Sequence, residues 1–457
     1  MKKILASMVA GLFLFGPMSA GFAGQKVGQG SKEEAKVMIE RAAQWYKQYG
    51  REKTLAEITR AGTEKRGEFI DRDLYIFAYD FNGVNVAHGS NPKLIGRDLI
   101  DMQDADGRYL IRGLIETARK GSGWYYYKWS NPISKKIEDK IAYVLKLDDG
   151  LWIGAGVYGK EAQVKKIGVL IMFEESRYHE ALQGMREQLD REGFGEPATT
   201  FIMENAMGSR VKAADLIRKF AEARVDLILT LGTVGTLAVT KEIKDIPVVF
   251  SVVYDPVDAG IARKLESSGN NTTGTTTHVP MSVLLQKLKE FAPVKKLAVL
   301  YTPGEKNSEA QLKELQKLQT NSPMKIVAVP LTRKEEVAEI MMEVVHTADA
   351  IYLTGSSIIG STTPIIVDMA NKAKVVTITH LEDMVDKGVL MGVCANSYSE
   401  GLLAGAKAAK ILQGAAPSSI PIELPKKIDV IFNLKSAQAG QFQVPSNFMK
   451  NVTRTVE

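Results

Sequence analysis

The stretch DLILTLGTVGTLAVTKEIKDIPVVFSVVYDP, residues 226–256, decides the fold of this chain. It begins with a short apolar run, Leu227 to Leu231, which is typical of a strand covered on both faces in a parallel sheet. A glycine ends that run, a helix is predicted next, and a second apolar run follows at 248–253. The stretch therefore predicts a strand–helix–strand unit of an α/β sheet.

Polar residues follow both strands of this unit. Thr233 and Thr236 open the helix, and the second strand breaks at Tyr254, Asp255 and Pro256. In open α/β sheets ligands bind outside the carboxyl ends of the strands, where free helix amides hold anions. Small hydroxyls at this place predict a small anionic or zwitterionic ligand. The alternative is that the two threonines only cap a helix, and the sequence leaves both interpretations open.

The same alternation continues from Ile167 to the end of the chain. Apolar runs predict strands at 167–173, 199–204, 227–231, 247–253, 297–301, 325–331, 350–355, 375–380 and 390–396. Stripes of apolar residues at helical spacing lie between them. This pattern predicts an α/β fold with two doubly wound parallel-sheet lobes. Polar loops end the strands in both halves, so we expect two facing rims and a cleft between them.

One loop of the second half is predicted to be long. Thr363 before Pro364 is typical of a helix start. The preceding residues, 355–362, are therefore expected to form a free loop that reaches the ligand.

Residues 31–158 have a different pattern. Ser31 and Glu34 form a capping box at the start of a long amphipathic helix. A hairpin is predicted at 74–79 and 84–89, and three more strands at 123–129, 141–147 and 151–158. The short turns predict an antiparallel sheet with helices on one side, an α+β domain that precedes the two lobes.

The first residues are typical of a targeting segment. Lys2 and Lys3 precede an apolar run at 4–15, and small residues lead to Ala23, so residues 1–23 are predicted to be a cleavable signal peptide. The apolar run is shorter than the roughly 20 residues of a membrane span; a permanent anchor is the alternative. Gly24 follows where a lipid-anchored protein needs a cysteine. We therefore expect a periplasmic or secreted protein.

Several function classes are disfavoured. The chain has 457 residues, too many for one core, and its formal net charge of +6 is too diffuse to indicate nucleic acid. The five histidines lack metal-ligand spacing, and the nucleophile-elbow and phosphate-loop motifs are missing, so no catalytic residue, metal or cofactor is predicted. Gly154, Gly156 and Gly159 spell a dinucleotide motif, but too few residues follow for its helix before Ile167. The single cysteine excludes an intramolecular disulfide.

The front region resembles a known family. The runs YDFNGVNVAHGSNPKLIGRDLIDMQDADG (79–107), GWYYYKWSNP (123–132) and WIGAGVY (152–158) are similar to those of single Cache domains, the extracellular sensor modules of bacterial receptors. The resemblance covers residues 30–160 and implies recognition of small carboxylates or amino acids. The pocket candidates that it implies are His88, Trp124, Tyr126, Lys128 and Tyr143. The alternative is that the aromatic residues are sheet packing and that Lys128 is solvated.

The remainder, residues 163–457, resembles the substrate-binding proteins of ABC transporters, in the branch with members that bind tryptophan, tyrosine or related amino acids. The runs that carry the resemblance are 230–265, GNNTTGTTT (269–277) and VLYTPGEKNSEAQ (299–311). It implies a hinged clamp with Asp255 as the partner of an α-amino group. The ligand-binding residues that it implies are Glu175, Ser176, Thr233, Thr236 and Asp255 in the first lobe, and Asn307, Ser308, Ser356 and Ser357 in the second.

These observations predict an exported, non-enzymatic binding protein that captures an amino-acid-like solute between two lobes for an ABC importer. The alternative is a sensory protein whose front domain recognises small carboxylates or amino acids and signals through a membrane receptor. The expected partners are thus a small-molecule ligand and an ABC permease or a receptor.

Overall fold

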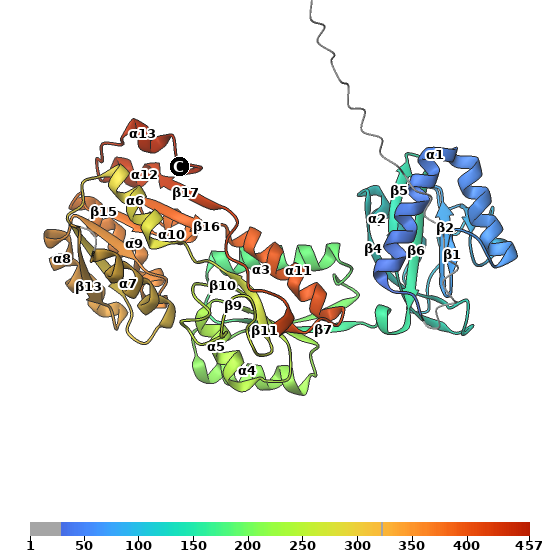
Figure 1. Ribbon diagram of the computed structural model, residues 1–457, viewed down its shortest axis with the longest axis horizontal. Coiled ribbons are helices and arrows are strands. Elements are labelled where there is room, and N and C mark those ends of the chain that lie inside the picture. Colours follow the sequence, from blue (N-terminus) through green and yellow to red (C-terminus); the bar gives the residue numbers. More distant parts are fainter. Residues whose placement is uncertain (1–28, 321–322) are drawn as a thin grey trace, which may run out of the picture.

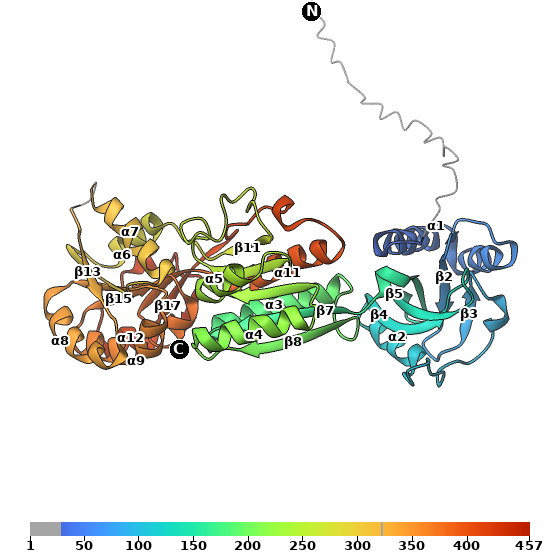
Figure 2. The same cartoon turned by 90° about the horizontal axis from the view of Figure 1, so that it is seen from below.

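The computed structural model describes residues 29–320 and 323–457, which form three β-sheets with covering helices (Figures 1 and 2). The predicted signal peptide, residues 1–23, lies outside the described residues. Among the helices of the described ranges, none is long and apolar enough to cross a membrane. The three sheets follow one another along the long axis, with the front domain at one end.

The front domain is built on an antiparallel sheet in the order β1-β2-β6-β5-β4, with β3 paired to β2. Its strands are β1 (Ile70–Asp71), β2 (Leu74–Tyr79), β3 (Asn85–His88), β4 (Ser122–Ser130), β5 (Ile137–Asp148) and β6 (Leu151–Tyr158). Its helices are α1 (Lys32–Glu64) and α2 (Leu110–Arg119), with 3₁₀ turns at Pro92–Leu94 and Gly159–Ala162. All five predicted strands are confirmed, as β2 to β6.

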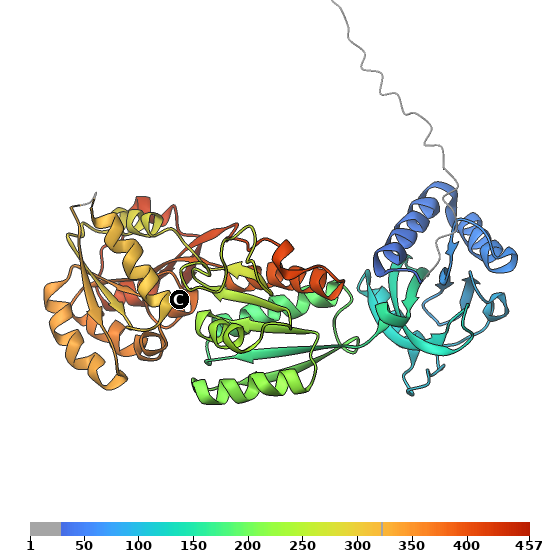
Figure 3. The ribbon, with the colours of Figure 1, turned by 60° about the horizontal axis from the view of Figure 1, so that its bottom comes forward.

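Helix α1 begins with the predicted capping box: the Glu34 amide donates to Ser31 Oγ at 3.2 Å, and the Ser31 amide donates to Glu34 Oε2 at 3.0 Å. Gly50, at φ 79° and ψ 175°, kinks the helix into two limbs (Figure 3). A non-helical backbone of this kind favours glycine, which lacks the Cβ that would clash.

The front sheet is covered on both faces, so the expectation of helices on one side is wrong. Helix α1 packs on one face with Ile76, Tyr126 and Ile141, whereas α2 packs on the other with Phe77 and neighbouring aromatic residues. Alternate residues of each strand point to opposite faces, so each strand contributes apolar side chains to both layers. Such strands appear as nearly unbroken apolar runs, which conceal the second layer from a reading of periodicity.

The first lobe has a fully parallel five-stranded sheet in the order β11-β10-β9-β7-β8. Its strands are β7 (Lys165–Ile171), β8 (Thr199–Asn205), β9 (Leu227–Leu231), β10 (Val248–Val253) and β11 (Thr272–Thr276). Its helices are α3 (Ser176–Arg191), α4 (Arg210–Glu222), α5 (Thr233–Glu242) and α11 (Ser397–Leu412), with a 3₁₀ turn at Pro417–Ser419. Helices α3 and α11 cover one face and α4 and α5 the other, which is the predicted doubly wound arrangement.

The second lobe has a seven-stranded sheet in the order β13-β12-β14-β15-β16-β17-β18, in which only β16 and β17 pair antiparallel. Its strands are β12 (Lys296–Tyr301), β13 (Lys325–Pro330), β14 (Ala350–Leu353), β15 (Val376–Thr379), β16 (Met391–Ala395), β17 (Ile428–Asn433) and β18 (Arg454–Val456). Its helices are α6 (Met281–Phe291), α7 (Lys306–Gln319), α8 (Val337–Thr347), α9 (Ser357–Lys372), α10 (Glu382–Asp386), α12 (Leu434–Ala439) and α13 (Ser446–Met449), with a 3₁₀ turn at Lys334–Glu336. The predicted strands of this lobe are confirmed.

In the described part of the chain, the backbone passes between the two lobes three times. It leaves the first lobe between β11 and α6, returns between β16 and α11, and leaves again before β17. Figure 1 shows α11, near the C-terminal end of the sequence, lying beside α3 in the first lobe. Both lobes are therefore made from two separate parts of the chain, and the three passages form a hinge.

Helices α3 and α11 approach closely because glycines face the partner backbone. A Cβ atom added at Gly401 would lie 2.0 Å from the carbonyl oxygen of Ala181, and one added at Gly184 would lie 2.3 Å from that of Tyr398. Real Cβ atoms do not approach this closely, so any larger residue must push the helices apart.

Gly401→Ala is expected to lower the free energy of unfolding by about 1–3 kcal/mol, because overpacking separates α3 from α11. Gly235→Ala is the matched control, since its Cβ would lie 3.5 Å from Met172 and the added methyl favours helix. Urea denaturation of the two variants would measure the difference. Equal midpoints would contradict the close approach of α3 and α11.

The front domain contacts the first lobe through the loop 193–198 that follows α3. Lys32 Nζ donates to the Gly193 carbonyl at 2.8 Å and lies 3.6 Å from the centre of the Phe194 ring. Ala198 packs into the front-domain core. Gly193 has a φ of +77°, and a Cβ there would lie 2.8 Å from the Trp124 ring. Trp124 is thus part of a contact between domains.

Candidate functional site

The strand ends of the second lobe carry a chain of buried hydroxyls. Ser308 Oγ accepts from the Thr302 amide at 3.0 Å and lies 2.6 Å from Thr354 Oγ1, while Thr302 Oγ1 lies 2.5 Å from Ser356 Oγ. Ser356 also caps α9, accepting from the amides of residues 358 and 359. The hydroxyls of Ser308 and Ser356 thus bind within the lobe and fix the loops after β12 and β14.

Glu305, just before α7, is a functional candidate that the sequence reasoning missed. Its carboxylate accepts from the Ser357 amide at 3.2 Å and from Ser357 Oγ at 2.6 Å. Burial raises the pKa of Glu305, although the bonds from Ser357 oppose that effect. Among the described residues, no cation lies within ion-pair distance of Glu305. A half-buried anion without a cationic partner is a natural acceptor for a positively charged ligand group.

Asn307, in the first turn of α7, lies beside this anion. Its Nδ2 donates to the Gly355 carbonyl. Its Oδ1 is buried and has no hydrogen-bond partner among the described residues. A buried acceptor without a hydrogen-bond partner costs free energy unless a ligand or a water molecule donates a hydrogen bond to it.

The predicted residues of the first lobe have different surroundings. Thr233 is nearly fully buried at the start of α5, after Gly232 at φ 80°. Thr236 Oγ1 donates to the Gly232 carbonyl at 2.8 Å, so this hydroxyl binds inside the lobe. Asp255 Oδ1 accepts from the amides of residues 257 and 258, both at 2.9 Å. Ser176 is exposed at the start of α3.

A pocket of about 380 Å³ lies where the loop before α7 meets the first lobe; we call it the interlobe pocket. Three helix starts meet there: Arg210 of α4, Thr233 of α5, and Glu305 before α7. Arg210 and Glu305 both line the pocket, and the Arg210 charge acts to lower the pKa of Glu305. The walls are mostly apolar and consist of Met172, Ala214, Ile217, Val234, Leu237 and Ala238. The remaining lining residues are Lys241, Glu242, Gly304 and Lys306.

This pocket brings together only part of the predicted set. Thr233 lines it, and Ser357 holds Glu305 at its edge. The other predicted residues do not line it. These are Glu175, Ser176, Thr236, Asp255, Asn307, Ser308 and Ser356.

A buried ion cluster joins the lobes close to Glu175. Arg177 Nη1 donates to Glu175 Oε2 at 2.9 Å and to Asp383 Oδ2 of the second lobe at 2.8 Å. Lys387 Nζ lies 3.4 Å from Glu175 Oε2 and 3.2 Å from Asp383 Oδ2. Burial acts to raise the pKa of Asp383, but the charges of Arg177 and Lys387 outweigh it and hold the pKa below its usual range. This cluster fastens the first lobe to the second.

A second candidate site lies inside the front domain, around Lys140. This side chain is fully buried; Lys140 Nζ donates to Tyr75 Oη at 2.8 Å and lies 4.1 Å from the centre of the Tyr75 ring and 4.7 Å from that of Tyr158. Burial lowers the pKa of Lys140 well below its usual range. A buried amine inside an aromatic cage, lacking a carboxylate within ion-pair distance among the described residues, suits an anionic ligand.

His88 shares this front pocket. Its Nδ1 accepts from the amides of Ser90 and Asn91 at 3.2 and 3.0 Å, which leaves the proton on Nε2. Burial, aided by the nearby charge of Lys140, lowers the pKa of His88 to about 3, so the ring is neutral. The cavity beside it has a volume of only about 10 Å³. Its lining residues are Tyr75, Phe77, Tyr79, His88, Leu110, Ile111, Leu114, Tyr127 and Trp129.

The other four predicted residues of the front domain lie away from this pocket. Trp124, Tyr126 and Tyr143 face the α1 side of the sheet. Lys128 Nζ is bound to Asp139 Oδ1 at 3.1 Å in a partly exposed pair. The structure brings only His88 of the predicted set into the front pocket.

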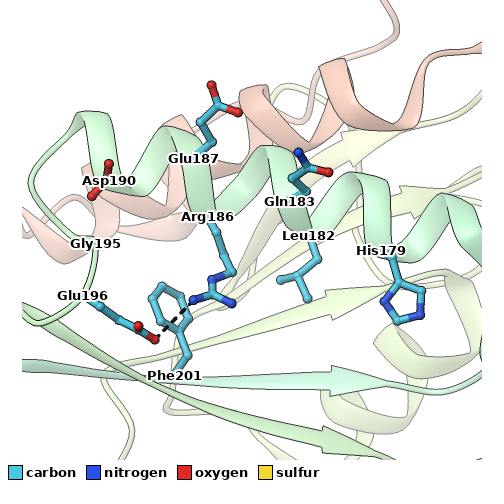
Figure 4. A pocket seen from close by; sticks show the side chains of 9 residues that line it. All are labelled: His179, Leu182, Gln183, Arg186, Glu187, Asp190, Gly195, Glu196 and Phe201. Atoms are coloured by element: carbon cyan, nitrogen blue, oxygen red, sulfur yellow. Dashed lines mark hydrogen bonds and ion pairs between the residues drawn. The ribbon is translucent and has the colours of Figure 1, made fainter. Parts of the chain in front are cut away.

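Another hollow, of about 520 Å³, is a groove on the outer side of α3 (Figure 4). Arg186 reaches across it to Glu196 at 3.2 Å and lies 4.8 Å from the centre of the Phe201 ring. All lining residues belong to the first lobe, and Arg186 and Glu196 of the lining form an ion pair with each other. We therefore favour the interlobe pocket as the ligand site.

Comparisons with known proteins agree with this architecture. A family model described as ABC transporter substrate binding protein matches residues 166–456, and one described as Single Cache domain 2 matches residues 18–168. The tyrosine-binding protein of Clostridioides difficile (strain R20291) is 28% identical over 282 residues, 61% of this chain and 81% of that protein. The sensor histidine kinase MctS of Rhizobium johnstonii is 40% identical over 88 residues, 19% of each chain.

A solved structure has the same two-lobed fold. The ABC domain from Streptococcus pneumonia in complex with L-Trp has a TM-score of 0.62 and 23% sequence identity, and it covers 64% of this chain and 100% of its own.

Proposed function

This chain belongs to the ABC transporter substrate-binding protein family, and we propose that it captures an amino acid between its lobes for an ABC importer. The observation that carries the proposal is the interlobe pocket, a mostly apolar hollow whose lining includes Arg210 at the start of α4 and Glu305 before α7. An amino acid is a zwitterion with an additional side chain, and this arrangement complements all three parts. The family is a solute-binding one, and we propose that the chain catalyses no reaction.

Each part of the ligand has a partner in this proposal. Arg210 and the free amides at the start of α5 hold the carboxylate, because a helix start and a guanidinium both favour anions. Glu305 accepts hydrogen bonds from the ammonium group. The apolar walls take the side chain, and the volume of about 380 Å³ lies within the roughly 300–1,000 Å³ of small-molecule sites.

The relatives favour an aromatic amino acid. One is named a tyrosine-binding protein, and the solved ABC domain holds L-Trp. We therefore propose L-tyrosine and L-tryptophan as the first ligands to test.

A thermal-shift screen tests this function. The processed protein is expected to be stabilised by about 2.7 kcal/mol at a ligand concentration 100 times the dissociation constant. Aromatic carboxylates without an amino group, such as phenylpropionate, should stabilise it far less. If no amino acid raises the unfolding temperature, the proposed function is contradicted.

The cellular location, the partners and the domain boundaries of this chain remain proposals. We propose that the protein works in the periplasm or outside the cell after removal of residues 1–23 and that it delivers its ligand to a permease. We also propose that residues 30–160 and 163–457 fold as separate domains, since no β-sheet is shared between the two ranges. Neighbouring permease and ATPase genes would favour transport, whereas a neighbouring kinase or chemoreceptor gene would favour the sensory alternative.

A second ligand function is favoured by Lys140. We propose that the front domain binds a small carboxylate between Lys140, the Tyr75 hydroxyl and His88 Nε2. A cavity of about 10 Å³ has room for about one water molecule, so only the smallest carboxylates, acetate and propionate, fit after a modest movement of the rings.

Lys140→Met is expected to weaken acetate or propionate binding by about 1.5–3 kcal/mol, the usual contribution of a hydrogen bond to a charged group. The unliganded protein should be as stable as the parent or more so, because the variant buries no amine. Lys128→Met is the matched control on the neighbouring strand. Calorimetric titration with propionate measures the affinity of both variants. A larger loss in the Lys128 variant would favour the opposite face of the sheet as the site.

A further inference from the structure

The interlobe pocket extends along α4 and α5, which lie side by side on one face of the first-lobe sheet (Figure 1). Both helices follow strands of the same parallel sheet, so both begin at the same edge of it. Lining residues recur at intervals of about one helical turn: Arg210, Ala214 and Ile217 on α4, and Val234, Leu237 and Lys241 on α5. Each row is about 10 Å long at the rise of an α-helix. The pocket is therefore a channel with two ends.

The two ends of this channel differ in chemistry. Arg210 and Glu305 lie at the end where the helices begin, and the proposed function assigns them the carboxylate and the ammonium group of the ligand. Lys241 and Glu242 line the other end, in the last turn of α5. A ligand held by its charged groups at the helix starts therefore directs its side chain along the apolar walls toward Lys241.

Lys241 is available to such a ligand. It is exposed, and its ammonium group has no hydrogen-bond or ion-pair partner among the described residues. Glu242 does not neutralise it, because adjacent residues of a helix do not face each other. A lysine ammonium group is a hydrogen-bond donor only, so its partner must be an acceptor at the end of the ligand's side chain.

We propose that Lys241 selects the side chain of the ligand, and that the pocket favours tyrosine over phenylalanine and tryptophan. This selection acts at the interlobe pocket and rests on the proposed function. The phenol oxygen of tyrosine accepts a hydrogen bond from Lys241 at the far end of the channel. Phenylalanine has no acceptor there, and the indole N–H of tryptophan is itself a donor.

A lysine at this position also has a role without a ligand. In the last turn of α5 its charge offsets the partial negative charge at the end of the helix. That role does not distinguish tyrosine from phenylalanine, because the two differ only in the phenol hydroxyl. Comparing these two amino acids therefore isolates the contact with Lys241.

The test is calorimetric titration of the full chain with tyrosine and with phenylalanine. The parent is expected to bind tyrosine at least about tenfold more tightly than phenylalanine, the usual effect of a hydrogen bond to a charged group. Lys241→Met keeps an apolar side chain of similar length and removes the donor, so its affinity for tyrosine should fall to its affinity for phenylalanine. Lys212→Met is the matched control and should keep the tyrosine preference, because Lys212 is exposed on α4 and does not line the pocket.

The outcomes separate this selection from the proposed function. Equal affinity of the parent for tyrosine and phenylalanine, or a Lys241→Met variant that keeps the preference, overturns the role of Lys241 and leaves amino acid capture intact. Glu242→Gln is the second variant: a preference lost there and kept in Lys241→Met would show that the phenol donates to Glu242 instead. If the parent binds no amino acid at all, the proposed function fails and the selection fails with it. Thermal unfolding without ligand checks that each variant is folded.

Discussion

Arg177→Ala is expected to weaken ligand binding by about 3–5 kcal/mol, a loss of at least a hundredfold. Arg177 is buried and is bound to Glu175 in one lobe and Asp383 in the other. Removing one partner of a buried ion pair leaves the other charges uncompensated, which costs about that much. The closed clamp therefore loses stability, whereas the separated lobes do not, since their carboxylates return to water.

Calorimetric titration with the amino acid from the screen measures this loss, and thermal unfolding without ligand checks the fold. Arg186→Ala is the matched control: it lies on the same helix, and its partner Glu196 is exposed (Figure 4). The control should bind like the parent. If both variants bind normally, the ion cluster does not hold the closed state.

Glu305→Gln is expected to weaken binding of an amino acid by about 2–5 kcal/mol, because the ammonium group loses its charged partner in a closed pocket. The amide keeps the size of the side chain and can still accept from Ser357, so the loop before α7 should stay in place. Affinity for a ligand without an amino group should change little.

Asp255→Asn distinguishes this assignment from the one that the sequence implied. Asp255 is bound to the amides of its own turn and does not line the interlobe pocket. We expect the Asp255 variant to bind within about tenfold of the parent in the same titration. A larger loss for Asp255→Asn than for Glu305→Gln would return the ammonium group to Asp255.

The architecture could be predicted from the sequence because parallel strands leave a strong local signal. The runs 227–231 and 248–253 are apolar except for one residue each and end at polar steps, and the structure places strands β9 and β10 there. Contacts between segments that are far apart in the sequence leave no such local signal. The first-lobe position of α11 depends on glycines such as Gly401, which only the folded chain brings against α3.

One helix boundary was wrong for a local reason. Thr363 and Pro364 suggested a helix start, but α9 begins at Ser357, and Pro364 lies inside it. Ser356 supplies the cap of α9, because its hydroxyl accepts from the Ile358 amide. The hydroxyl of Thr363 donates to the carbonyl of Ile359 at 2.8 Å, inside the helix. The expected free loop at 355–362 is therefore mostly helix.

The site was only partly predictable, and the front domain shows why. Residues of one strand alternate between two faces, so Trp124 and Tyr126 face α1 whereas Tyr125 and Tyr127 face the opposite side. Both faces are aromatic, and no residue in the sequence marks which one holds the ligand. A shift of one residue exchanges the faces completely. For the same reason the sequence favoured Lys128 over Lys140.

The interlobe partners were hidden by distance along the chain. Arg177 meets Asp383, which lies 206 positions away, and a single sequence gives no indication of that pairing. Glu305 resembled an ordinary residue before a helix, since its burial comes from Ser357 and the opposite lobe.

The most direct test of the account is a crystal structure of the protein with the amino acid that the screen identifies. The account predicts electron density in the interlobe pocket, with the ligand nitrogen within hydrogen-bond distance of Glu305, the carboxylate at Arg210 and the start of α5, and the side chain against Met172 and Leu237. Density for the amino acid in the groove outside α3, or beside Asp255 with Glu305 uncontacted, would contradict it.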